Sequence, residues 1–273
     1  MLENFVEYFE KIPNAHRTLI IVSGIVFFWI LEGIVPLFKF EYHKIKHAGT
    51  NLTFTLTTIV VNFAFALLIL KASDWGVANK FGLLYIFDLS LWGMLIVGLL
   101  LLDLIGAYAI HWIQHKIKFM WKFHMVHHAD TYIDVTSANR HHPGESFFRA
   151  AFTLLAVIIL GAPIWLVMLY QSVSVILSQF NHANFKFPLW LDRAISWIIV
   201  SPNMHKVHHH YVRPQTDSNY GNIFSIWDRL FATFNYTPVE ELKYGLDVLN
   251  DQTSSDLKYQ FKIPFTKGIK TDY

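Results

Sequence analysis

Long apolar runs alternate with polar connectors over residues 18–180. Thr18–Phe38 and Leu52–Leu70 each come close to the ~20 apolar residues that a helix needs to cross a bilayer. Phe81–Ile110 is long enough to cross once and to emerge among the lipid headgroups. Ala150–Phe180 has 31 residues and no charge, and a Gly-Ala-Pro break at residues 161–163 divides it. This last run predicts a hairpin of two helices that enters and leaves on the same side of the membrane.

These runs predict an all-α fold, a polytopic integral membrane bundle of helices. A shorter segment, Phe187–Val200, is apolar except for Asp192, Arg193 and Ser196. Those three residues share one helical face, so the segment predicts an interfacial helix that lies on the membrane with this polar face toward water.

Composition supports a membrane protein. Hydrophobic residues make up 53% of the chain and charged residues 15%, whereas a soluble domain carries about 25% charged residues. The net charge of +2 gives no reason to expect a nucleic-acid partner. The chain has no Cys, which excludes disulfides, thiolate zinc sites, iron–sulfur clusters and Cys nucleophiles. No basic stretch precedes an apolar core before Arg17, so we expect no cleaved signal peptide.

Basic residues in the connectors predict the orientation. On the side of the N-terminus we count Lys11, Arg17, Lys71 and Lys80. The opposite side carries more, namely Lys39, Lys44, Lys46, Lys116, Lys118, Lys122, Arg140 and Arg149. The positive-inside rule makes this second side cytoplasmic. We therefore expect a multi-pass protein of a bacterial inner membrane, or of the endoplasmic reticulum membrane in a eukaryote.

Histidine is the residue type that carries the candidate chemistry. Of the 15 His, 12 lie between residues 111 and 210, on the side predicted to be cytoplasmic. Three clusters have the spacing of metal ligands, because residues i, i+3 and i+4 share one helical face. They are His111 and His115, then His124, His127 and His128, and then His205, His208 and His209.

Neutral imidazole binds Fe, Zn, Cu and Ni well. The three clusters supply eight rings, and His142 and His182 would raise the number to ten. Ten rings suit two metal ions at about five nitrogens each. The predicted hairpin returns His182 to the side that holds His142, where both can join the clusters.

The remaining His favour simpler interpretations. His16 is expected to be structural or interfacial, and His43 and His47 to lie on a solvated face. His141 and His210 each adjoin a better candidate ligand. Asp103 lies two helical turns before His111, where it can orient that ring or bind a neighbouring helix.

At these residues the sequence resembles the fatty acid hydroxylase superfamily, which includes sterol desaturases, sterol C4-methyl oxidases and alkylglycerol monooxygenase. The resemblance covers roughly residues 101–234. The matching segments are His111–His115, Phe123–His128, Arg140–Glu145, Asn181-His182, Met204–His209, Asn219–Gly221 and Trp227–Phe231. One departure is Trp112, which stands where many members have Arg.

The resemblance implies a membrane enzyme with a cytosol-facing diiron centre that uses O2 to hydroxylate or desaturate a lipid chain. Carried over residue by residue, the metal ligands and catalytic residues would be His111, His115, His124, His127, His128, His142, His182, His205, His208 and His209. Possible partners that orient these rings are Asp103, Glu145, Asn181 and Asp228. Zn can substitute for iron in purified protein, because imidazole sites accept both metals.

The chain divides accordingly into three expected parts. Residues 1–110 hold the N-terminal transmembrane helices, and residues 111–235 form a histidine-rich catalytic region that includes the membrane hairpin at residues 150–180. Residues 236–273 form a soluble C-terminal tail.

The expected activity is an O2-dependent lipid hydroxylase, with a desaturase as the alternative on the same site. Electrons would come from a separate electron-transfer protein or reductase, because the chain has no haem, flavin or iron–sulfur motif. A zinc-dependent membrane hydrolase is a second class, but no His is followed by Glu as its usual motif requires. A metal transporter or haem protein is a third class, and a transporter would place its polar residues at mid-membrane depth.

Overall fold

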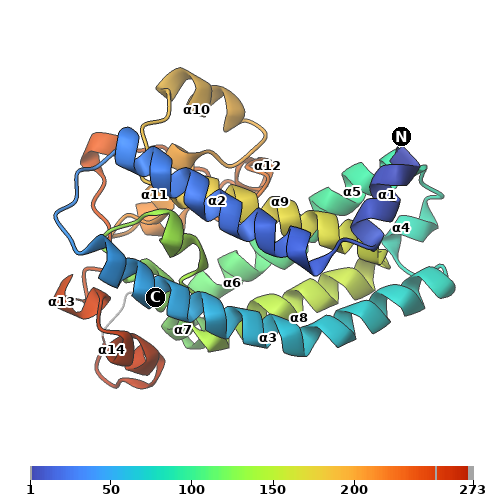
Figure 1. Ribbon diagram of the computed structural model, residues 1–273, viewed down its shortest axis with the longest axis horizontal. Helices are drawn as coiled ribbons and strands as arrows, with labels where there is room; N and C mark the ends of the chain where they lie inside the picture. The colour runs from blue at the N-terminus through green and yellow to red at the C-terminus, as the bar shows by residue number, and fades with distance from the viewer. Residues whose placement is uncertain (1, 250, 270–273) are drawn as a thin grey trace.

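A computed structural model of the protein describes residues 2–249 and 251–269. Among these described residues, five helices are long and apolar enough to cross a membrane, which confirms the all-α polytopic bundle. They run along the long axis of the molecule (Figure 1). Their bounds are α2 (Asn14–Ile34), α3 (Lys44–Ala78), α5 (Leu91–Asp103) continued by α6 (Ile110–Lys116), α8 (Pro143–Leu160) and α9 (Ile164–His182).

The predicted hairpin is the pair α8 and α9. The break between them begins at Gly161, whose φ of 65° is left-handed, and ends at Pro163, which precedes the first turn of α9. Gly is needed at residue 161 because a side chain there would clash with the carbonyl oxygen of Phe81. The two helices then pack on different neighbours, α8 on α3 and α9 on α2.

The third span contains a local change of helix type. A π-helical segment, η1 (Leu104–Ala109), joins α5 to α6, and the first two clustered histidines follow within α6. π-Helical turns inside α-helices are rare overall, and those that occur often lie at functional sites.

Short helices gather at the histidine-bearing end of the molecule (Figure 1). They are α7 (Lys118–His128), the 3₁₀ helix η2 (Val135–Asn139), α10 (Leu189–Ile195), α11 (Pro202–His208), η3 (Gln215–Asp217), α12 (Ile226–Leu230), η4 (Val239–Glu241), α13 (Asp251–Ser254), α14 (Leu257–Lys262) and η5 (Ile263–Phe265). The opposite end carries α1 (Leu2–Glu10) and α4 (Leu83–Ile86).

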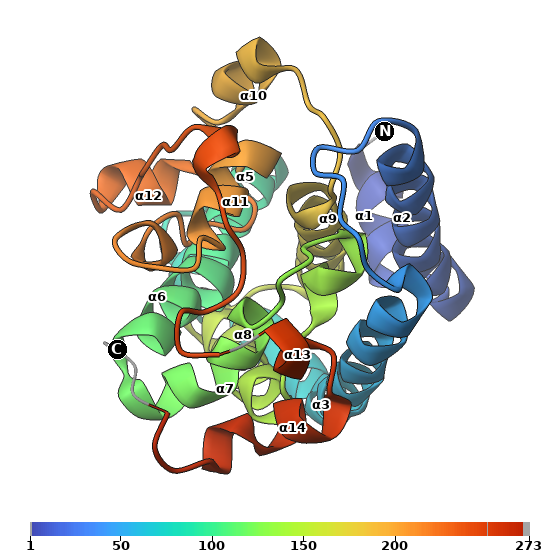
Figure 2. The ribbon, with the colours of Figure 1, turned by 90° about the vertical axis from the view of Figure 1, so that its left-hand side faces the viewer.

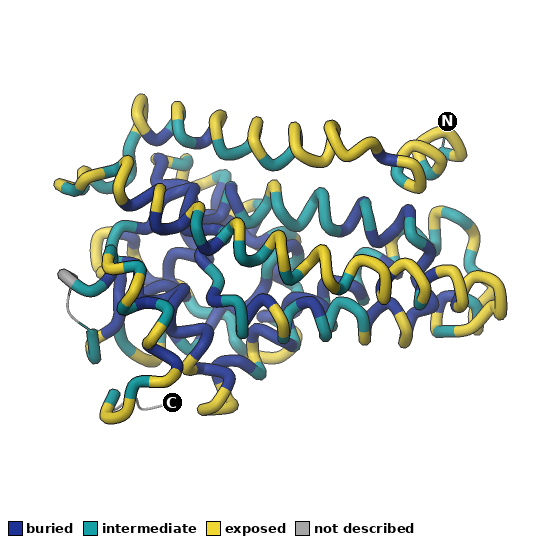
Figure 3. The backbone as a smooth tube through the Cα atoms, turned by 60° about the horizontal axis from the view of Figure 1, so that its bottom comes forward, coloured by how far each residue is buried: buried dark blue, intermediate teal, exposed yellow. Residues whose placement is uncertain are grey.

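Burial divides the molecule in the same way. Buried residues concentrate at the histidine-bearing end, whereas the long helices keep exposed stretches along their outer sides (Figure 3). Many of the exposed side chains on these helices are large and apolar; Phe63 of α3, for example, is 83% exposed. Apolar side chains on the outside of long helices are what a surface in contact with lipid requires.

The described residues after Tyr236 include several that pack on the rest of the protein. Leu246 and Ile263 join a buried cluster with Trp121 and Met125 of α7. Arg140 donates to the carbonyl oxygen of Ser254. This segment therefore covers the outer side of α7.

The prediction for Phe187–Val200 is wrong in its orientation. Asp192 and Ser196 are buried, whereas we expected them to face water. The Asp192 carboxylate accepts hydrogen bonds from Ser201 Oγ at 2.9 Å and from the Asn203 backbone N–H at 3.0 Å. It is buried because it caps the start of α11. Only Arg193 of the three polar residues is exposed.

Candidate metal centre

Two groups of buried histidines lie at the ends of the long helices that we predict to face the cytosol. In each group the possible ligand nitrogens all lie within 4.8 Å of one another. The first group holds His111, His115, His124, His128 and His208, and the second holds His127, His182, His205 and His209.

Nε2 atoms converge in the first group. Nε2 of His124 lies 3.1 Å from Nε2 of His111 and 3.1 Å from Nε2 of His128. The ring of His208 comes from α11 and lies 4.4 Å from the ring of His111, centroid to centroid. Nitrogen lone pairs that crowd together in this way are the arrangement that a metal ion requires.

The second group converges on His182, the last residue of α9. Its Nε2 lies 3.3 Å from Nε2 of His127, 3.2 Å from that of His205 and 3.2 Å from that of His209. The two groups are adjacent, because the rings of His128 and His209 stack with centroids 4.8 Å apart.

Helical spacing explains how each cluster divides between the groups. On α7, His124 and His128 are four residues apart and face the first group, while His127 faces the second. On α11, His205 faces the second group and His208 the first, and His209 follows the helix directly. Each repeat of the pattern H-x2-H-H therefore supplies both groups.

Backbone carbonyls orient several of the rings from outside. Nδ1 of His111 lies 2.8 Å from the Tyr220 carbonyl oxygen, and Nδ1 of His208 lies 2.6 Å from that of Ser218. Nδ1 of His182 lies 2.7 Å from the carbonyl oxygen of Ser178. A carbonyl only accepts, so each Nδ1 donates its proton and leaves the Nε2 lone pair pointing into the group.

Two buried carboxylates hold the loop that supplies the Tyr220 carbonyl. Asp228 accepts the backbone N–H groups of Tyr220 at 2.8 Å and Gly221 at 2.9 Å. Asp103 accepts the backbone N–H of Phe224 at 3.0 Å. Asp103 therefore acts on His111 only through this loop. It also accepts a hydrogen bond from Nε1 of Trp227 in α12 at 3.2 Å, which is the contact with a neighbouring helix that our second interpretation expected.

Of the other two predicted ring partners, one contacts a clustered histidine. Glu145 Oε1 lies 2.8 Å from Nδ1 of His124. Asn181 donates to the Asn222 carbonyl oxygen at 3.2 Å and bonds to none of the clustered rings in the part of the chain that the structure describes.

Burial keeps the histidines of α7 and α11 neutral. It lowers the pKa of these rings, and the nearby histidines lower it further, for His124, His127, His128, His205 and His209. Burial also lowers the pKa of His208, to about 3. Neutral rings are the form that binds a metal ion.

His142 lies outside both groups, although the sequence placed it among the candidate ligands. Its Nδ1 accepts the backbone N–H of Gly144 at 3.1 Å and so caps α8, which Pro143 begins. Its neighbour His141, which the sequence disfavoured, lies nearer the second group, with its ring centroid 5.0 Å from that of His127. His210 accepts the backbone N–H of Lys243 and is not part of either group.

The expectation for His47 is wrong, whereas His43 is exposed as expected. His47 is buried, with Nε2 2.8 Å from Asp130 and Nδ1 3.2 Å from Asp134. Burial would raise the pKa of Asp130, but His47 and Arg140 hold it well below its usual range. Two Asp follow the second histidine cluster within six residues, but no local pattern links them to His47, which lies 83 residues before Asp130.

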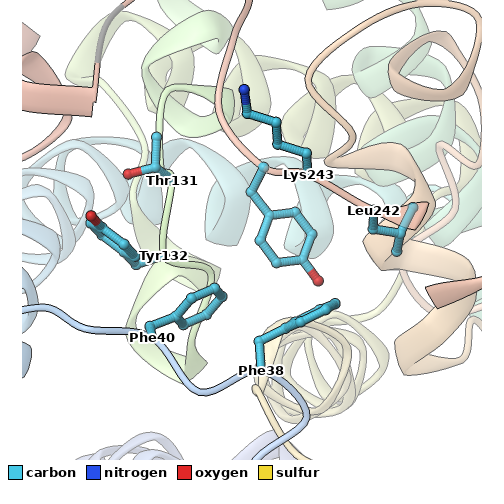
Figure 4. Close-up of a pocket in the computed structure, with 7 residues that line it drawn as sticks. Phe38, Phe40, Thr131, Tyr132, Leu242 and Lys243 are labelled. Carbon is cyan, nitrogen blue, oxygen red and sulfur yellow. The ribbon is translucent and has the colours of Figure 1, made fainter. Parts of the chain in front are cut away.

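A pocket of 230 Å³ lies apart from the histidine groups (Figure 4). Aromatic side chains form most of its wall. Its lining residues are Phe38, Phe40, Thr131, Tyr132, Leu242, Lys243 and Tyr244.

The donor set fits a pair of transition-metal ions. Nine buried imidazoles in two adjacent groups offer only nitrogen, which suits iron, zinc or copper and does not suit Mg²⁺ or Ca²⁺. Carbonyl and carboxylate partners behind the rings are the arrangement typical of histidines that bind metal.

The family model for fatty acid hydroxylases matches residues 95–233, about half of the chain. An ornithine lipid hydroxylase of Rhizobium tropici is 29% identical over 143 residues, which cover 52% of this chain and 42% of that protein. Alkylglycerol monooxygenase of Xenopus tropicalis is 30% identical over 148 residues, 52% of this chain and 30% of that protein. Cholesterol 25-hydroxylase of Mus musculus is 24% identical over 147 residues, 54% of this chain and 48% of that protein.

The chain thus spans less than half the length of these three curated relatives. No solved structure matches it at a significant level.

Proposed function

Because the chain belongs to the fatty acid hydroxylase family, we propose that it is a membrane oxidoreductase that uses two iron ions and O2 to hydroxylate a lipid. The observation that carries the proposal is the pair of adjacent, buried, all-histidine groups. One iron would be held by the group around His124 and the other by the group around His182. Bound iron would supply the redox power to activate O2 and cleave a C–H bond, which zinc lacks.

The nine ligands of this proposal differ from the ten drawn from the sequence by the loss of His142. Its Nδ1 already accepts a backbone N–H, so that lone pair is not free for a metal ion. The remaining ligands are His111, His115, His124, His127, His128, His182, His205, His208 and His209.

The chain's own residues hold the rings and exclude water. Glu145 and the carbonyls of Ser178, Ser218 and Tyr220 fix ring orientation before any metal binds, which reduces the cost of ordering the site. Burial of the rings limits the loss of reactive species to solvent.

Hydroxylation of R–H by O2 gives R–OH and water and consumes two electrons and two protons. The electrons would come from a separate electron-transfer protein or reductase, because the chain has no Cys for an iron–sulfur cluster and no flavin or haem motif. Desaturation uses the same site and differs in the fate of the substrate after the first hydrogen leaves. We favour hydroxylation because the relatives named above are hydroxylases and a monooxygenase.

The proposed orientation places the histidine groups at the cytoplasmic face of the membrane. It rests on the excess of Lys and Arg in the connectors on this side. The substrate would reach the groups from the bilayer, since the five spans bring the site directly to its surface.

The test is metal analysis and lipid mass spectrometry on the same protein. We expect two irons per chain after expression with iron and, with the protein present, a lipid that is heavier by one oxygen derived from ¹⁸O2. A mass loss of two hydrogens would favour the desaturase. Release of free acid or alcohol from the lipid without uptake of ¹⁸O would overturn the proposal in favour of a hydrolase.

A further inference from the structure

The outer side of α10 is apolar although it lies beyond the long helices. Its polar residue Asp192 points inward to cap α11. On the outer side Trp190 is 73% exposed and Trp197, just after the helix, is 64% exposed. Exposed apolar side chains that gather in this way mark a surface for a partner or a membrane.

A second short helix extends this surface. Leu230 of α12 is 70% exposed and Phe231, which follows it, is 51% exposed. The two helices are joined, because the Arg229 guanidinium lies 4.1 Å from the centre of the Trp197 ring. In Figure 2, α10 and α12 lie on the side of the molecule away from α3. We call this surface the α10–α12 edge; it consists of Leu189, Trp190, Trp197, Ile198, Leu230 and Phe231.

The edge is continuous with a membrane span. The Phe231 ring stacks on the Tyr108 ring with centroids 5.3 Å apart, and Tyr108 belongs to the span Leu91–Lys116. This contact joins the edge to the third span near the first histidine cluster, which begins at His111. Cations border it: Arg193 is exposed, and Arg229 lies over Trp197. Tryptophan beside cationic side chains is the composition of a membrane–water interface.

We propose that the α10–α12 edge is immersed in the headgroup region of the same bilayer that the five helices cross. Trp190, Trp197 and Phe231 then contact acyl chains and glycerol, and Arg193 reaches lipid phosphates. The histidine-bearing end of the protein is held down against the membrane at its rim as well as at its spans. This inference depends on the spans and the edge alone, and not on the proposed chemistry.

Site-directed spin labelling can test the immersion, because the chain has no Cys of its own. Single Cys variants Ile198→Cys and Leu230→Cys are labelled with a nitroxide, and the full-length protein is placed in nanodiscs of phosphatidylcholine and phosphatidylglycerol. Phe63→Cys on the outer side of α3 is the lipid control, and Glu240→Cys, an exposed position in η4, is the water control.

We expect both edge labels to collide with O2 more often than with a water-soluble nickel chelate, as the label at Phe63 does. The label at Glu240 should show the reverse. Nickel accessibility at residues 198 and 230 equal to that at residue 240 would overturn the proposal and leave the edge as a water-facing surface for a partner protein. Protection from both reagents with dipolar broadening would also overturn it and would indicate a second copy of the chain on this surface.

Discussion

Glu145 Oε1 lies 2.8 Å from Nδ1 of His124, and both side chains are fully buried. His124 belongs to α7, whereas Glu145 stands in the first turn of the membrane helix α8. Arg149, one turn further along α8, donates to the same oxygen at 3.0 Å. The first turns of a membrane helix therefore set the orientation of a ring in the first histidine group.

Replacing Glu145 with Ala should weaken metal binding while the protein still inserts in the membrane. Loss of a carboxylate behind a ligating histidine typically lowers metal affinity about 10–100-fold. Chelator competition on the purified, metal-loaded protein measures the change. Glu240→Ala, which removes an exposed Glu outside both histidine groups, is the matched control. Equal resistance of both variants to the chelator would show that the Glu145 contact does not support the metal.

His208→Ala and His210→Ala should differ sharply although the two residues lie two positions apart. His208 belongs to the first group, whereas His210 accepts a backbone N–H from Lys243. We expect metal content to fall and activity to be lost in His208→Ala only. Metal analysis of both purified variants decides the matter. Full occupancy in His208→Ala would contradict the two-metal site, and loss in His210→Ala would show that the ligand set is incomplete.

His142→Ala should keep its metal and lose some stability. The ring caps α8 through the Gly144 N–H, and loss of a helix cap typically costs about 1 kcal/mol. The measurement pairs metal content with the midpoint of thermal unfolding in detergent. A clear loss of metal in this variant would restore His142 to the ligand set.

His47→Ala should destabilise the fold far more than His43→Ala. It leaves Asp130 and Asp134 buried without the imidazole between them, and breaking a buried ionic pair costs about 3–5 kcal/mol. His43 is exposed and has no such partners among the described residues. The measurement is the denaturation midpoint of each variant, recorded under the same detergent conditions. Matching midpoints would mean that this network contributes nothing to stability.

Cysteine labelling of intact cells tests the orientation. Asp74→Cys, an exposed position near the end of α3, should react with an impermeant maleimide from outside. Glu240→Cys should react only after the membrane is opened, because the charge of the connectors puts it in the cytoplasm. Labelling of Glu240→Cys in intact cells would reverse the proposed orientation.

The spans and the clustered histidines were predictable because both depend on local sequence. Helical periodicity alone brings His124 and His128 to one face, and an apolar run alone predicts a crossing. His47 was not predictable in this way, because its partner Asp130 lies 83 residues away and only the packing of α3 brings them together. The partners of Asp192 are nearer in sequence, at Ser201 and Asn203, but a helical-face argument does not consider a turn that follows the helix.

The sequence alone did not show which of His141 and His142 lies nearer the histidine groups, because that depends on where α8 begins. Pro143 begins α8, so His142 becomes the capping residue and its ring turns back onto Gly144. His141, one residue earlier, is left to approach His127. A motif that contains adjacent histidines does not by itself show which ring turns toward the site.

The π-helical segment before α6 sets the rotation of α6, which carries His111 and His115, relative to the membrane helix α5. An α-helix turns by about 100° per residue, so each residue gained or lost above His111 rotates everything after it by that angle. Leu104–Ala109 takes up such an extra residue and leaves α5 facing its neighbours while His111 and His115 face the first group. Deleting a single residue here would turn the rings of His111 and His115 away from His124, although no ligand residue would be replaced. The number of residues in this short stretch therefore matters to the first histidine group as directly as the two histidines that follow it.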